Sequence, residues 1–326
     1  MSEHFKPLRA TIAEVDGQPP LLTDTTAALV ALSNELQTVT SSPNPEAALL
    51  GSGGLALLTG AIANEAVILP DPIDDWITGI AGDTTAVTRD AIVAQLNAKW
   101  RADVLPFCTT ATQGRYPFDQ SGQIDVKMTD FSRLFGSGGM IDNFIEDSLL
   151  QYVNTDTRPW SWRSDFGLPS EVLAPFENAR AIRDALFAGG TVPVIGFTLV
   201  PTDLSPNASR VTLNVDGQQI SYFHASAAGV PMTWPGTGTN MISLSFVPSG
   251  NEPEAIRTVT GEWAILRLIG NGQLRPTNLS DLFDLRLGAD GYSASFQLEA
   301  NSVVNPFDLQ LFSGFPCPQG LSLIHI

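Results

Sequence analysis

The spacing of the apolar residues changes near Gly190, and this change constrains the fold more than any other feature of the sequence. Before Gly190, apolar residues recur every three or four positions, which is the period of amphipathic helices. After Gly190 they alternate with polar residues, as in strands that bury one face. The sequence therefore predicts an α+β protein of two domains. An all-helical domain over residues 1–187 precedes an antiparallel β-sandwich over residues 188–318.

The helical half contains several segments with the helical period. They are residues 25–39, 47–62, 88–105, 130–135, 140–153 and 170–187. The clearest is 88–105, where Ile92, Leu96 and Trp100 share one face. The last of them has Ser170 as its predicted N-cap and ends before two consecutive glycines.

The second half contains short alternating segments separated by turn residues. They are residues 192–200, 211–215, 220–224, 242–246, 283–287 and 296–300. Asp216-Gly217 is a strong signal for a two-residue hairpin turn between two of these strands. Residues 262–269 break the pattern, because Trp263, Leu266 and Arg267 are spaced for a short helix inserted into the sandwich.

Charge and composition exclude several classes of protein. The 326 residues hold 17 Lys and Arg against 34 Asp and Glu, a net charge of −17, which argues against binding to nucleic acid or to anionic lipid. The sequence lacks the uninterrupted apolar run of ~18 residues that a membrane span needs. Two cysteines are too few for a disulfide framework or a metal cluster.

The sequence offers no catalytic constellation. It lacks the Gly-x-Ser-x-Gly elbow of hydrolases and the phosphate-binding loop that ends in Gly-Lys-Ser/Thr. Its three histidines include two near the termini, and His224 is expected to bond to backbone at a strand end. Zinc sites need more His and Cys than this. We therefore predict no catalytic residue, no cofactor and no metal.

An alternative function uses carboxylates and aromatic side chains on sugars. Paired carboxylates carry out glycoside hydrolysis, and exposed aromatic rings stack on sugar rings. The candidate residues are Asp71, Asp74, Asp75, Asp125, Asp130, Trp160, Trp162 and Phe166. Helix caps and packing between the two halves explain the same residues without any sugar. The alternative prediction is a periplasmic carbohydrate- or peptidoglycan-binding or hydrolytic domain.

Ordered motifs between Cys108 and Pro318 carry a family resemblance. They are Arg115-Tyr116-Pro117-Phe118, Asp125-Val126, Asp130-Phe131, Gly138-Gly139, Asp142, Trp160-x-Trp162, Asp216-Gly217, Tyr222-Phe223-His224, Trp234-Pro235-Gly236, Gly261-Glu262-Trp263-Ala264, Arg267-Leu268, Asn305-Pro306-Phe307 and Phe315-Pro316-Cys317-Pro318. In this order and spacing they resemble the C-terminal periplasmic region of the TssM (IcmF-type) subunit of the type VI secretion membrane complex.

The resemblance implies a structural scaffold and not an enzyme. Such subunits link the inner membrane to a TssJ-type outer-membrane lipoprotein through their periplasmic C-terminal region, and several copies assemble together. A TssL-type inner-membrane subunit is a further partner, through regions mostly absent here. Family members are longer, with membrane spans and a cytoplasmic ATP-binding signature in some. The chain is thus expected to be a periplasmic part of an inner-membrane-anchored protein.

A sandwich presents loops at its ends and strand edges at its sides, so a lipoprotein partner is expected to pack against apolar loop residues or to add a strand. The candidate loop residues are Trp234, Pro235, Gly236, Asn305, Pro306 and Phe307. The open alternative is that Trp234 and Phe307 plug the ends of the sandwich. The periplasm permits a disulfide between Cys108 and Cys317, but the sequence leaves open whether the two pair. Residues 319–326 are expected to be a non-native tail, because 321–326 resemble a translated sequencing adaptor.

Overall fold

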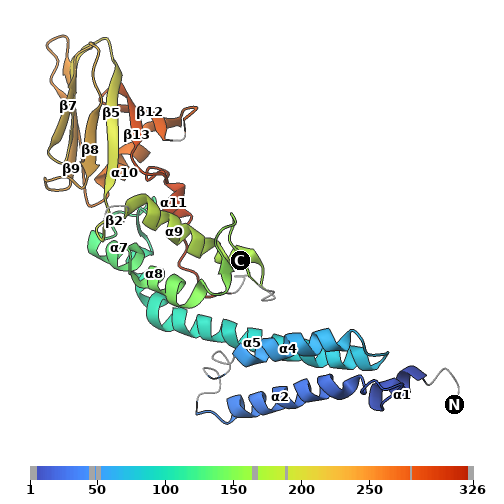
Figure 1. The fold of residues 1–326 in the computed structure, drawn as a ribbon. Helices are drawn as coiled ribbons and strands as arrows, with labels where there is room; N and C mark the ends of the chain where they lie inside the picture. The colour runs from blue at the N-terminus through green and yellow to red at the C-terminus, as the bar shows by residue number, and fades with distance from the viewer. Residues whose placement is uncertain are drawn as a thin grey trace. The chain divides into compact units, whose positions relative to one another are not determined.

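The computed structural model of the chain describes residues 6–43, 48, 53–163, 168–187, 190–279 and 281–321. It divides into two compact units, Met1–Lys99 and Trp100–Ile326, called here the N-terminal unit and the C-terminal unit. Figure 1 shows the first unit as helices and the second as helices followed by two sheets. The predicted α+β class, with helices first and an antiparallel sandwich second, is confirmed. The predicted domain boundary after residue 187 coincides with the change from helices to strands and stays a prediction.

The N-terminal unit consists of long helices. They are α1 (Lys6–Ile12), α2 (Leu22–Thr40), α4 (Gly53–Ala66) and α5 (Ile73–Lys99). The predicted helix over 25–39 lies within α2, whereas the start of the one predicted over 47–62 falls mostly outside the described residues. Helix α5 begins much earlier than the predicted residue 88, directly after Pro72, with Asp74 and Asp75 in its first turn. Acidic groups at this position favour helix initiation because they complement the helix dipole.

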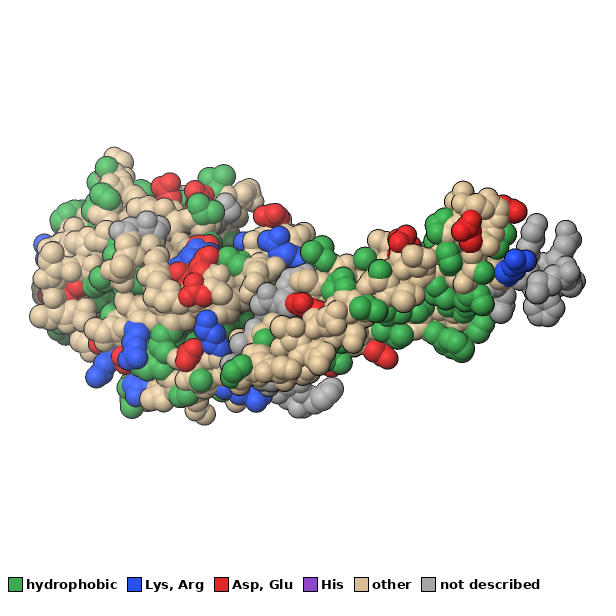
Figure 2. All heavy atoms as spheres, turned by 60° about the horizontal axis from the view of Figure 1, so that its bottom comes forward, with side chains coloured by type: hydrophobic (Ala, Val, Ile, Leu, Met, Phe, Trp, Pro, Cys, Tyr) green, Lys and Arg blue, Asp and Glu red, His purple; other side chains and the backbone are tan. Residues whose placement is uncertain are grey.

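Aliphatic side chains form the core of the N-terminal unit. The buried cluster comprises Leu32, Val39, Leu55, Ile62, Ala66, Leu69, Ile77 and Ala81. Other apolar side chains of this unit lie on its surface, and hydrophobic atoms cover much of the helical part at the right of Figure 2. No helix in the described part of the chain combines the length and apolar character that crossing a bilayer needs.

Short helices and two small sheets open the C-terminal unit. They are η2 (Trp100–Val104), α6 (Leu105–Thr112), β1 (Arg115–Tyr116), β2 (Ile124–Asp125), α7 (Met128–Phe135), α8 (Met140–Phe144), η3 (Ile145–Leu149), β3 (Val153–Asn154), β4 (Ser161–Trp162), η4 (Ser170–Leu173) and α9 (Ala174–Leu186). The predicted helix over 140–153 is thus α8 and the π-helical turn η3, and it ends where β3 pairs with β4. Aromatic rings fill the core here, with Trp100, Phe144 and Phe176 in mutual contact.

Two antiparallel sheets form the sandwich. The strands are β5 (Ile195–Leu204), β6 (Ala208–Val215), β7 (Gln218–Tyr222), β8 (Val230–Trp234), β9 (Met241–Pro248), β10 (Ala255–Thr260), β11 (Gln273–Pro276), β12 (Leu282–Ala289) and β13 (Tyr292–Ala300). One sheet has the order β10-β9-β6-β7 and the other β11-β12-β13-β5-β8. Alternate residues of the inner strands, such as Phe197, Leu244 and Phe296, are buried between the sheets. This is the packing that the period of two predicts.

The hairpin and the inserted helix lie where the sequence predicts them. Val215 pairs with Gln218 across Asp216 and Gly217, which both have positive φ, at 49° and 94°. Positive φ at both central residues is typical of a type I′ turn. Helix α10 (Ala264–Gly270) interrupts the strands between β10 and β11, and helix α11 (Gln310–Ser313) follows the sandwich.

The sequence does not predict β8, β10 or β11. All three are edge strands, each paired on one side only. Polar and charged residues are frequent along edge strands, and β10 and β11 carry too few alternating apolar residues to stand out in the sequence. Strand β8 also carries Pro231, which reads as a turn signal in the sequence but suits an edge.

Candidate functional site

The two predicted partner loops lie at the end of the sandwich that adjoins the helical part of the C-terminal unit. Trp234 ends β8 opposite Ile195, the first residue of β5 after the last helix. The loop after β13 begins beside them, because Asn301 N–H bonds to the carbonyl of Gly196. Both loops therefore belong to the junction between helices and sandwich, which Figure 1 shows as the lower end of the sheets.

Trp234 is fully buried, and its indole Nε1 donates to the carbonyl oxygen of Glu262 at 2.9 Å. Pro235 and Gly236 are half-buried beside it. The side chain at position 236 must be absent, because a Cβ there would overlap the carbonyl of Asp216. The sequence left open whether Trp234 packs inside the chain, and in the structure it does. Partner binding by the exposed residues of this loop stays a prediction.

The carboxylate of Asp216 holds the loop after Trp234. Asp216 is 2% exposed and accepts backbone N–H groups from Gly236 at 2.8 Å and from Asn240 at 2.8 Å. A buried carboxylate is costly unless such donors satisfy it. The hairpin residue found by its turn signal thus also anchors a neighbouring loop, a role that sequence reasoning missed. The signal in the sequence is the pair of glycines in this loop, because Gly238 leaves room for the carboxylate of Asp216 and Gly236 leaves room for its backbone carbonyl.

The second predicted loop is packed in the same manner. Phe307 is 2% exposed and meets Phe197 of β5 edge to face, with ring centroids 5.4 Å apart. Pro306 is buried, and the half-buried Asn305 accepts the backbone N–H of Phe307 through Oδ1 at 3.0 Å. Exposed residues flank this packed segment, with Val303 fully exposed before it and Asp308 exposed after it.

The two cysteines are joined in a disulfide bond. Cys108 of α6 and Cys317, 209 residues later, have Cα atoms 6.0 Å apart, within the normal range for a disulfide. The segment that follows lies along η2, since the indole of Trp100 donates to the carbonyl of Pro318 at 2.6 Å and Arg101 Nε to that of Gln319 at 3.1 Å. Residues 322–326 of the predicted non-native tail lie outside the described residues.

Motifs far apart in the sequence meet at what we call the joint, formed by Asp125, Val126, Glu262, Trp263 and Arg267. The indole of Trp263 donates to the carbonyl of Val126 at 2.7 Å, and Trp263 N–H donates to Asp125 Oδ2 at 3.2 Å. Glu262 accepts the backbone N–H of Met128. Asp125 also pairs with Arg267 at 2.5 Å, with both side chains mostly buried. The joint therefore fixes the inserted helix α10 of the sandwich to the helical part of the unit.

Gly261 and Tyr116 make two further contacts with residues of the joint. Gly261 has φ of +125°, and a Cβ there would overlap the carboxylate of Asp125. The Arg267 guanidinium lies 3.9 Å above the ring of Tyr116, a cation–π contact. Burial raises the pKa of the Tyr116 phenol above its ordinary value, so this hydroxyl stays neutral.

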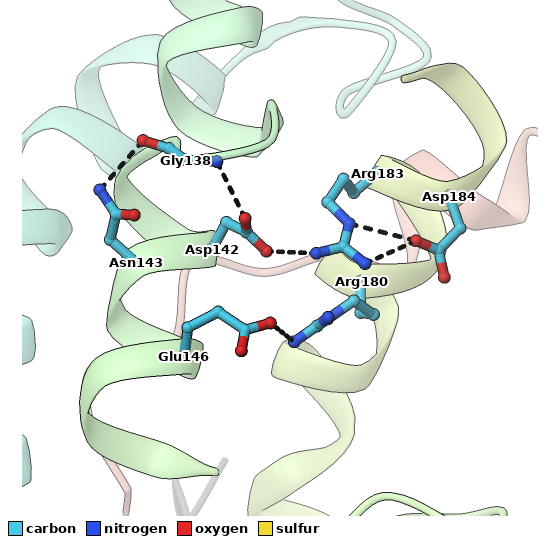
Figure 3. Close-up of polar contacts among 7 residues, drawn as sticks. All are labelled: Gly138, Asp142, Asn143, Glu146, Arg180, Arg183 and Asp184. Carbon is cyan, nitrogen blue, oxygen red and sulfur yellow. Dashed lines mark hydrogen bonds and ion pairs between the residues drawn. The ribbon is translucent and has the colours of Figure 1, made fainter. Parts of the chain in front are cut away.

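A second polar network ties α8 to α9 (Figure 3). Asp142 accepts the backbone N–H of Gly138 at 2.9 Å and pairs with Arg183 at 2.5 Å. Arg183 also pairs with Asp184, and one turn away Arg180 pairs with Glu146 at 2.6 Å. Burial lowers the pKa of Arg183, but the carboxylates of Asp184 and Asp142 together raise it above its ordinary value. These contacts are structural, because each arginine of α9 pairs with a carboxylate of the preceding helical segment, Arg183 with Asp142 and Arg180 with Glu146.

Structural contacts occupy several residues of the sugar-binding alternative. Trp160 is 2% exposed and offers no ring face to a ligand, Trp162 is half-buried in the short strand β4, and Phe166 lies outside the described residues. Asp125 forms an ion pair with Arg267, and Asp130 lies in the first turn of α7. His224 donates its Nε2 proton to the carbonyl of Ala208 at 2.7 Å, as expected for a strand-end histidine.

Asp71, Asp74 and Asp75 gather at the start of α5. Each offers a carboxylate oxygen within 4.8 Å of the others. The hydrogen bond with Asp74 and the repulsion from Asp74 and Asp75 raise the pKa of the exposed Asp71. This cluster reads as the acidic first turn of a helix.

Two surface hollows lie in the described part of the C-terminal unit. One, of about 300 Å³, lies beside the disulfide and is lined by Thr112, Phe118, Asp119 and Phe315 among others. Hydrogen bonds from Ser121 hold the pKa of Asp119 below its ordinary value, which favours the ionised carboxylate. The other, of about 460 Å³, is lined by Arg183 and its partners.

Comparison with known families decides what kind of chain this is. The profile of the type VI secretion protein IcmF helical domain matches residues 92–190, and that of the IcmF C2-like domain matches residues 197–302. The chain is a TssM-type C-terminal region of the IcmF family. The type VI secretion system component TssM1 of Pseudomonas aeruginosa is 31% identical to it over 343 residues. That alignment covers 98% of this chain and 30% of the relative, so the chain spans less than a third of TssM1.

Solved structures share the fold of this TssM-type region. A TssM C-terminal domain from EAEC superposes with a TM-score of 0.61 at 22% identity, over 70% of this chain and 97% of that domain. A chain of a type VI membrane complex superposes with a TM-score of 0.76 at 18% identity, over 97% of this chain and 70% of that chain. Similarity at these identities establishes the fold. The matched domain models and the relative TssM1 are both named for type VI secretion, so the chain belongs to this type VI secretion family.

Proposed function

We propose that the chain is a periplasmic, non-enzymatic part of a type VI secretion envelope complex, and that it links the inner membrane to a TssJ-type outer-membrane lipoprotein. The similarity to TssM1 across 98% of the chain is the observation that carries this proposal. In it, the full-length protein provides the membrane anchor and the contacts to a TssL-type subunit. Several copies of the chain stand together in the assembled complex.

The use of the polar residues supports a scaffold. Across the described residues, the carboxylates and arginines with the closest contacts pair with one another at the joint and between α8 and α9. Such pairs hold elements in fixed positions and leave no group poised for proton transfer or nucleophilic attack. The alternative of a sugar-binding or hydrolytic domain would need an exposed Trp160 and a free Asp125. The ring of Trp160 is buried and Asp125 pairs with Arg267.

The disulfide supports a periplasmic location. Disulfides persist in the oxidising periplasm and are rare in the cytosol. A bond that joins α6 to the segment after α11 closes most of the C-terminal unit into one covalent loop. Stability gained in this manner suits a domain that works outside the cytoplasm.

The lipoprotein would contact the exposed residues of the two predicted loops. Thr237, Gly238 and Thr239 are exposed in the loop that Asp216 anchors, and Val303 is exposed in the other. An anchored loop loses little entropy when it binds, which favours it as a docking element. Trp234, Pro306 and Phe307 then act from below as the packed support of these loops.

Biolayer interferometry between this chain and the soluble part of the neighbouring TssJ-type lipoprotein tests the proposal. We expect saturable binding with a Kd of about 1 μM or tighter. Absence of binding by a folded sample would contradict the link to the lipoprotein. Degradation or retention of peptidoglycan by the chain would favour the alternative.

Substitutions then separate docking from packing. Thr239→Glu and Val303→Glu place charges on the exposed loop tips and are expected to weaken binding by roughly tenfold or more at unchanged thermal stability. Phe223→Glu is the matched control, because Phe223 is an exposed apolar residue at the other end of the sandwich. Trp234→Ala is expected to lower the melting temperature. Unchanged affinity in both loop variants would show that the partner docks elsewhere.

A further inference from the structure

The sandwich has four edge strands, and they differ in whether another strand could pair with them. The edges are β10 and β7 in one sheet and β11 and β8 in the other. An edge strand presents backbone N–H and C=O groups that its own sheet leaves unpaired. Natural proteins usually block such edges, because an open edge pairs readily with another chain.

The ladder shows which backbone groups of β10 face outward. Gly261 N–H bonds to the carbonyl of Asn240, one step beyond the pair Thr260 and Met241. Met241 in turn bonds through its carbonyl to Asp216 on the opposite side of β9. Hydrogen-bonded and non-bonded pairs alternate along an antiparallel ladder. The N–H and C=O groups of Ile256, Thr258 and Thr260 therefore point away from β9, toward the open edge.

The edge of β8 is closed. Pro231 has no N–H to offer. The side-chain amide of Gln218 covers Thr233, accepting its N–H through Oε1 at 2.9 Å and donating through Nε2 to its carbonyl at 2.7 Å. One glutamine thus occupies both backbone groups that a pairing strand would need.

The edges of β11 and β7 are short. Thr277 N–H bonds to the carbonyl of Leu282, so Leu274 and Pro276 are the outward positions of β11, and the proline lacks an N–H. Asp216 bonds toward β9, so Val215 and Leu213 bond toward their β7 partners Gln218 and Ile220. The outward positions of β7 are therefore Gln219 and Ser221. Only β10 offers three successive outward positions, each with its N–H, among the edges of the described sandwich.

The side chains of β10 favour pairing as well. Ile256 is 56% exposed, and Thr258 and Thr260 are exposed beside it on the outer face. On the inner face Arg257 and Val259 are half-buried, although the equivalent residues of β9 are buried. Arg257 reaches across to the carbonyl of Gly288 in the other sheet at 3.4 Å, and the half-buried Val259 keeps apolar surface that a further strand would cover. Across the described residues no hydrogen bond reaches the outward groups of Ile256, Thr258 or Thr260.

We propose that the β10 edge pairs antiparallel with the β10 edge of a second copy of this chain, about a two-fold axis at Thr258. In this register Ile256 faces Thr260 of the second copy, Thr258 faces Thr258, and Arg257 faces Val259. All three outward positions then pair, β-branched side chains meet on the outer face, and no like charges lie directly opposite. The two four-stranded sheets become one continuous sheet.

Neighbouring registers are less favourable. A shift that pairs Ile256 with Thr258 places Arg257 directly opposite Arg257, and like charges in this position destabilise a ladder. The opposite shift pairs Thr258 with Thr260 and leaves Ile256 without a partner. The register about Thr258 is therefore the one that the charges and the hydrogen-bonding groups both favour.

This inference deepens the proposed assembly in several copies and rests on it, but its test needs no lipoprotein. Failure of lipoprotein binding and failure of edge pairing are therefore separate results. The contact is a single pair of short strands, which is small compared with stable dimer interfaces, so we expect weak association that many copies in one complex would reinforce.

Cysteine crosslinking of the full chain tests the register. Both native cysteines are in the disulfide, so Thr258→Cys adds a single free thiol. With a short bis-maleimide at high protein concentration, we expect Thr258→Cys to form dimers at least ~10 times faster than Gln219→Cys, since opposite residues in a ladder lie close together. Gln219 is the matched control, exposed and outward-facing on the β7 edge. Ile256→Cys, which faces Thr260, is expected to crosslink more slowly than Thr258→Cys.

Sedimentation equilibrium provides a second measurement that does not depend on thiols. Thr258→Lys would place two ammonium groups face to face and is expected to weaken dimerisation by ~10-fold, while Gln219→Lys leaves it unchanged. Both positions are exposed and tolerate lysine without unfolding. Equal crosslinking at positions 258 and 219, or a wild-type chain that stays monomeric at millimolar concentration, would overturn the proposal.

Discussion

The two units of the chain bury different kinds of side chain. The N-terminal unit packs aliphatic residues such as Leu32 and Ile62 into its core. The largest buried side chains of the described chain, among them Trp100, Trp263 and Phe131, all belong to the C-terminal unit. Half of the exposed large apolar side chains lie in the shorter N-terminal unit, with Trp76 67% exposed. The comparison teaches that a few long helices leave apolar surface uncovered, whereas packed layers bury it.

The ion pairs of the two units also differ in how far apart in the sequence their partners lie. In the C-terminal unit, Arg267 and Arg183 pair with carboxylates from elements distant in sequence. In the described part of the N-terminal unit, the ion pair Arg89–Asp90 joins neighbours on one helix. Contacts between distant elements fix tertiary structure, while a pair on one exposed helix contributes little. The C-terminal unit should therefore unfold as the more stable of the two.

The largest effect should come from the disulfide. Replacing Cys108 and Cys317 together by serine removes a cross-link whose loop-closure entropy is worth ~5 kcal/mol for a loop of this length. We expect calorimetry to show a lower transition for the C-terminal unit and an unchanged one for the N-terminal unit. Two free thiols in denatured, unreduced wild-type protein would contradict the pairing.

A matched pair of tryptophan substitutions should sharpen the contrast between the two units. Trp263→Ala removes a fully buried ring and leaves the carbonyl of Val126 without its donor, so we expect a loss of ~4 kcal/mol. Trp76→Ala should change stability by no more than ~0.5 kcal/mol because the ring is mostly exposed. Urea unfolding monitored by circular dichroism measures both. If both variants lost a similar free energy of unfolding, the contrast between a buried core in the C-terminal unit and an exposed ring in the N-terminal unit would be wrong.

Removal of the joint's carboxylate should have a smaller effect. Asp125→Ala leaves the mostly buried Arg267 without a carboxylate partner, and we expect a loss of ~2–3 kcal/mol. Asp142→Ala should lose less, ~1–2 kcal/mol, because Arg183 keeps Asp184. The difference between the two free energies of unfolding is the measured quantity. A larger loss for Asp142→Ala would mean that the joint is not the stronger of the two contacts.

The smallest effect concerns the acidic turn of the N-terminal unit. The neighbours of Asp71 raise its pKa, so the folded unit holds a proton there more readily than the unfolded chain does. This contribution to stability is present below the unfolded pKa and is lost as the pH rises through the folded pKa. We expect Asp74→Asn to lower the pKa of Asp71 toward its ordinary value, measured by an NMR titration. An unchanged value would assign the shift to Asp75 or to burial.

The sequence predicted the class of the fold and the elements with a strong period. The strands in the middle of each sheet, the end of α9 and the turn at Asp216-Gly217 lie where periodicity and turn chemistry placed them. The predicted N-cap at Ser170 is wrong, because residues 170–173 form the 3-10 turn η4, no side chain caps it, and α9 begins only at Ala174. The first half of α5 was missed, because glycines and β-branched residues there are poor helix formers in isolation. Packing against α4 forms this part of the helix, and such packing is not visible in local sequence.

The candidate site was predictable only in part, because its contacts join residues far apart in the chain. Trp263 and Val126 are separated by 137 residues, and no local pattern shows that one donates to the other. The matching motifs pointed to both residues without saying that they meet. For Trp234 the sequence left both partner contact and internal packing open, and the structure buries the ring. Burial depends on what packs above a residue, and only the tertiary structure provides that.

The position of the disulfide has a mechanical consequence. A pull applied between the residues that precede Cys108 and those that follow Cys317 would pass directly from one sulfur to the other. The helices and the sandwich between the two cysteines would then bear none of this force. A load that enters through the sandwich, for example from a docked partner, would instead reach α6 through hydrogen bonds and packed rings. The same domain would therefore be rigid along one direction of tension and extensible along another.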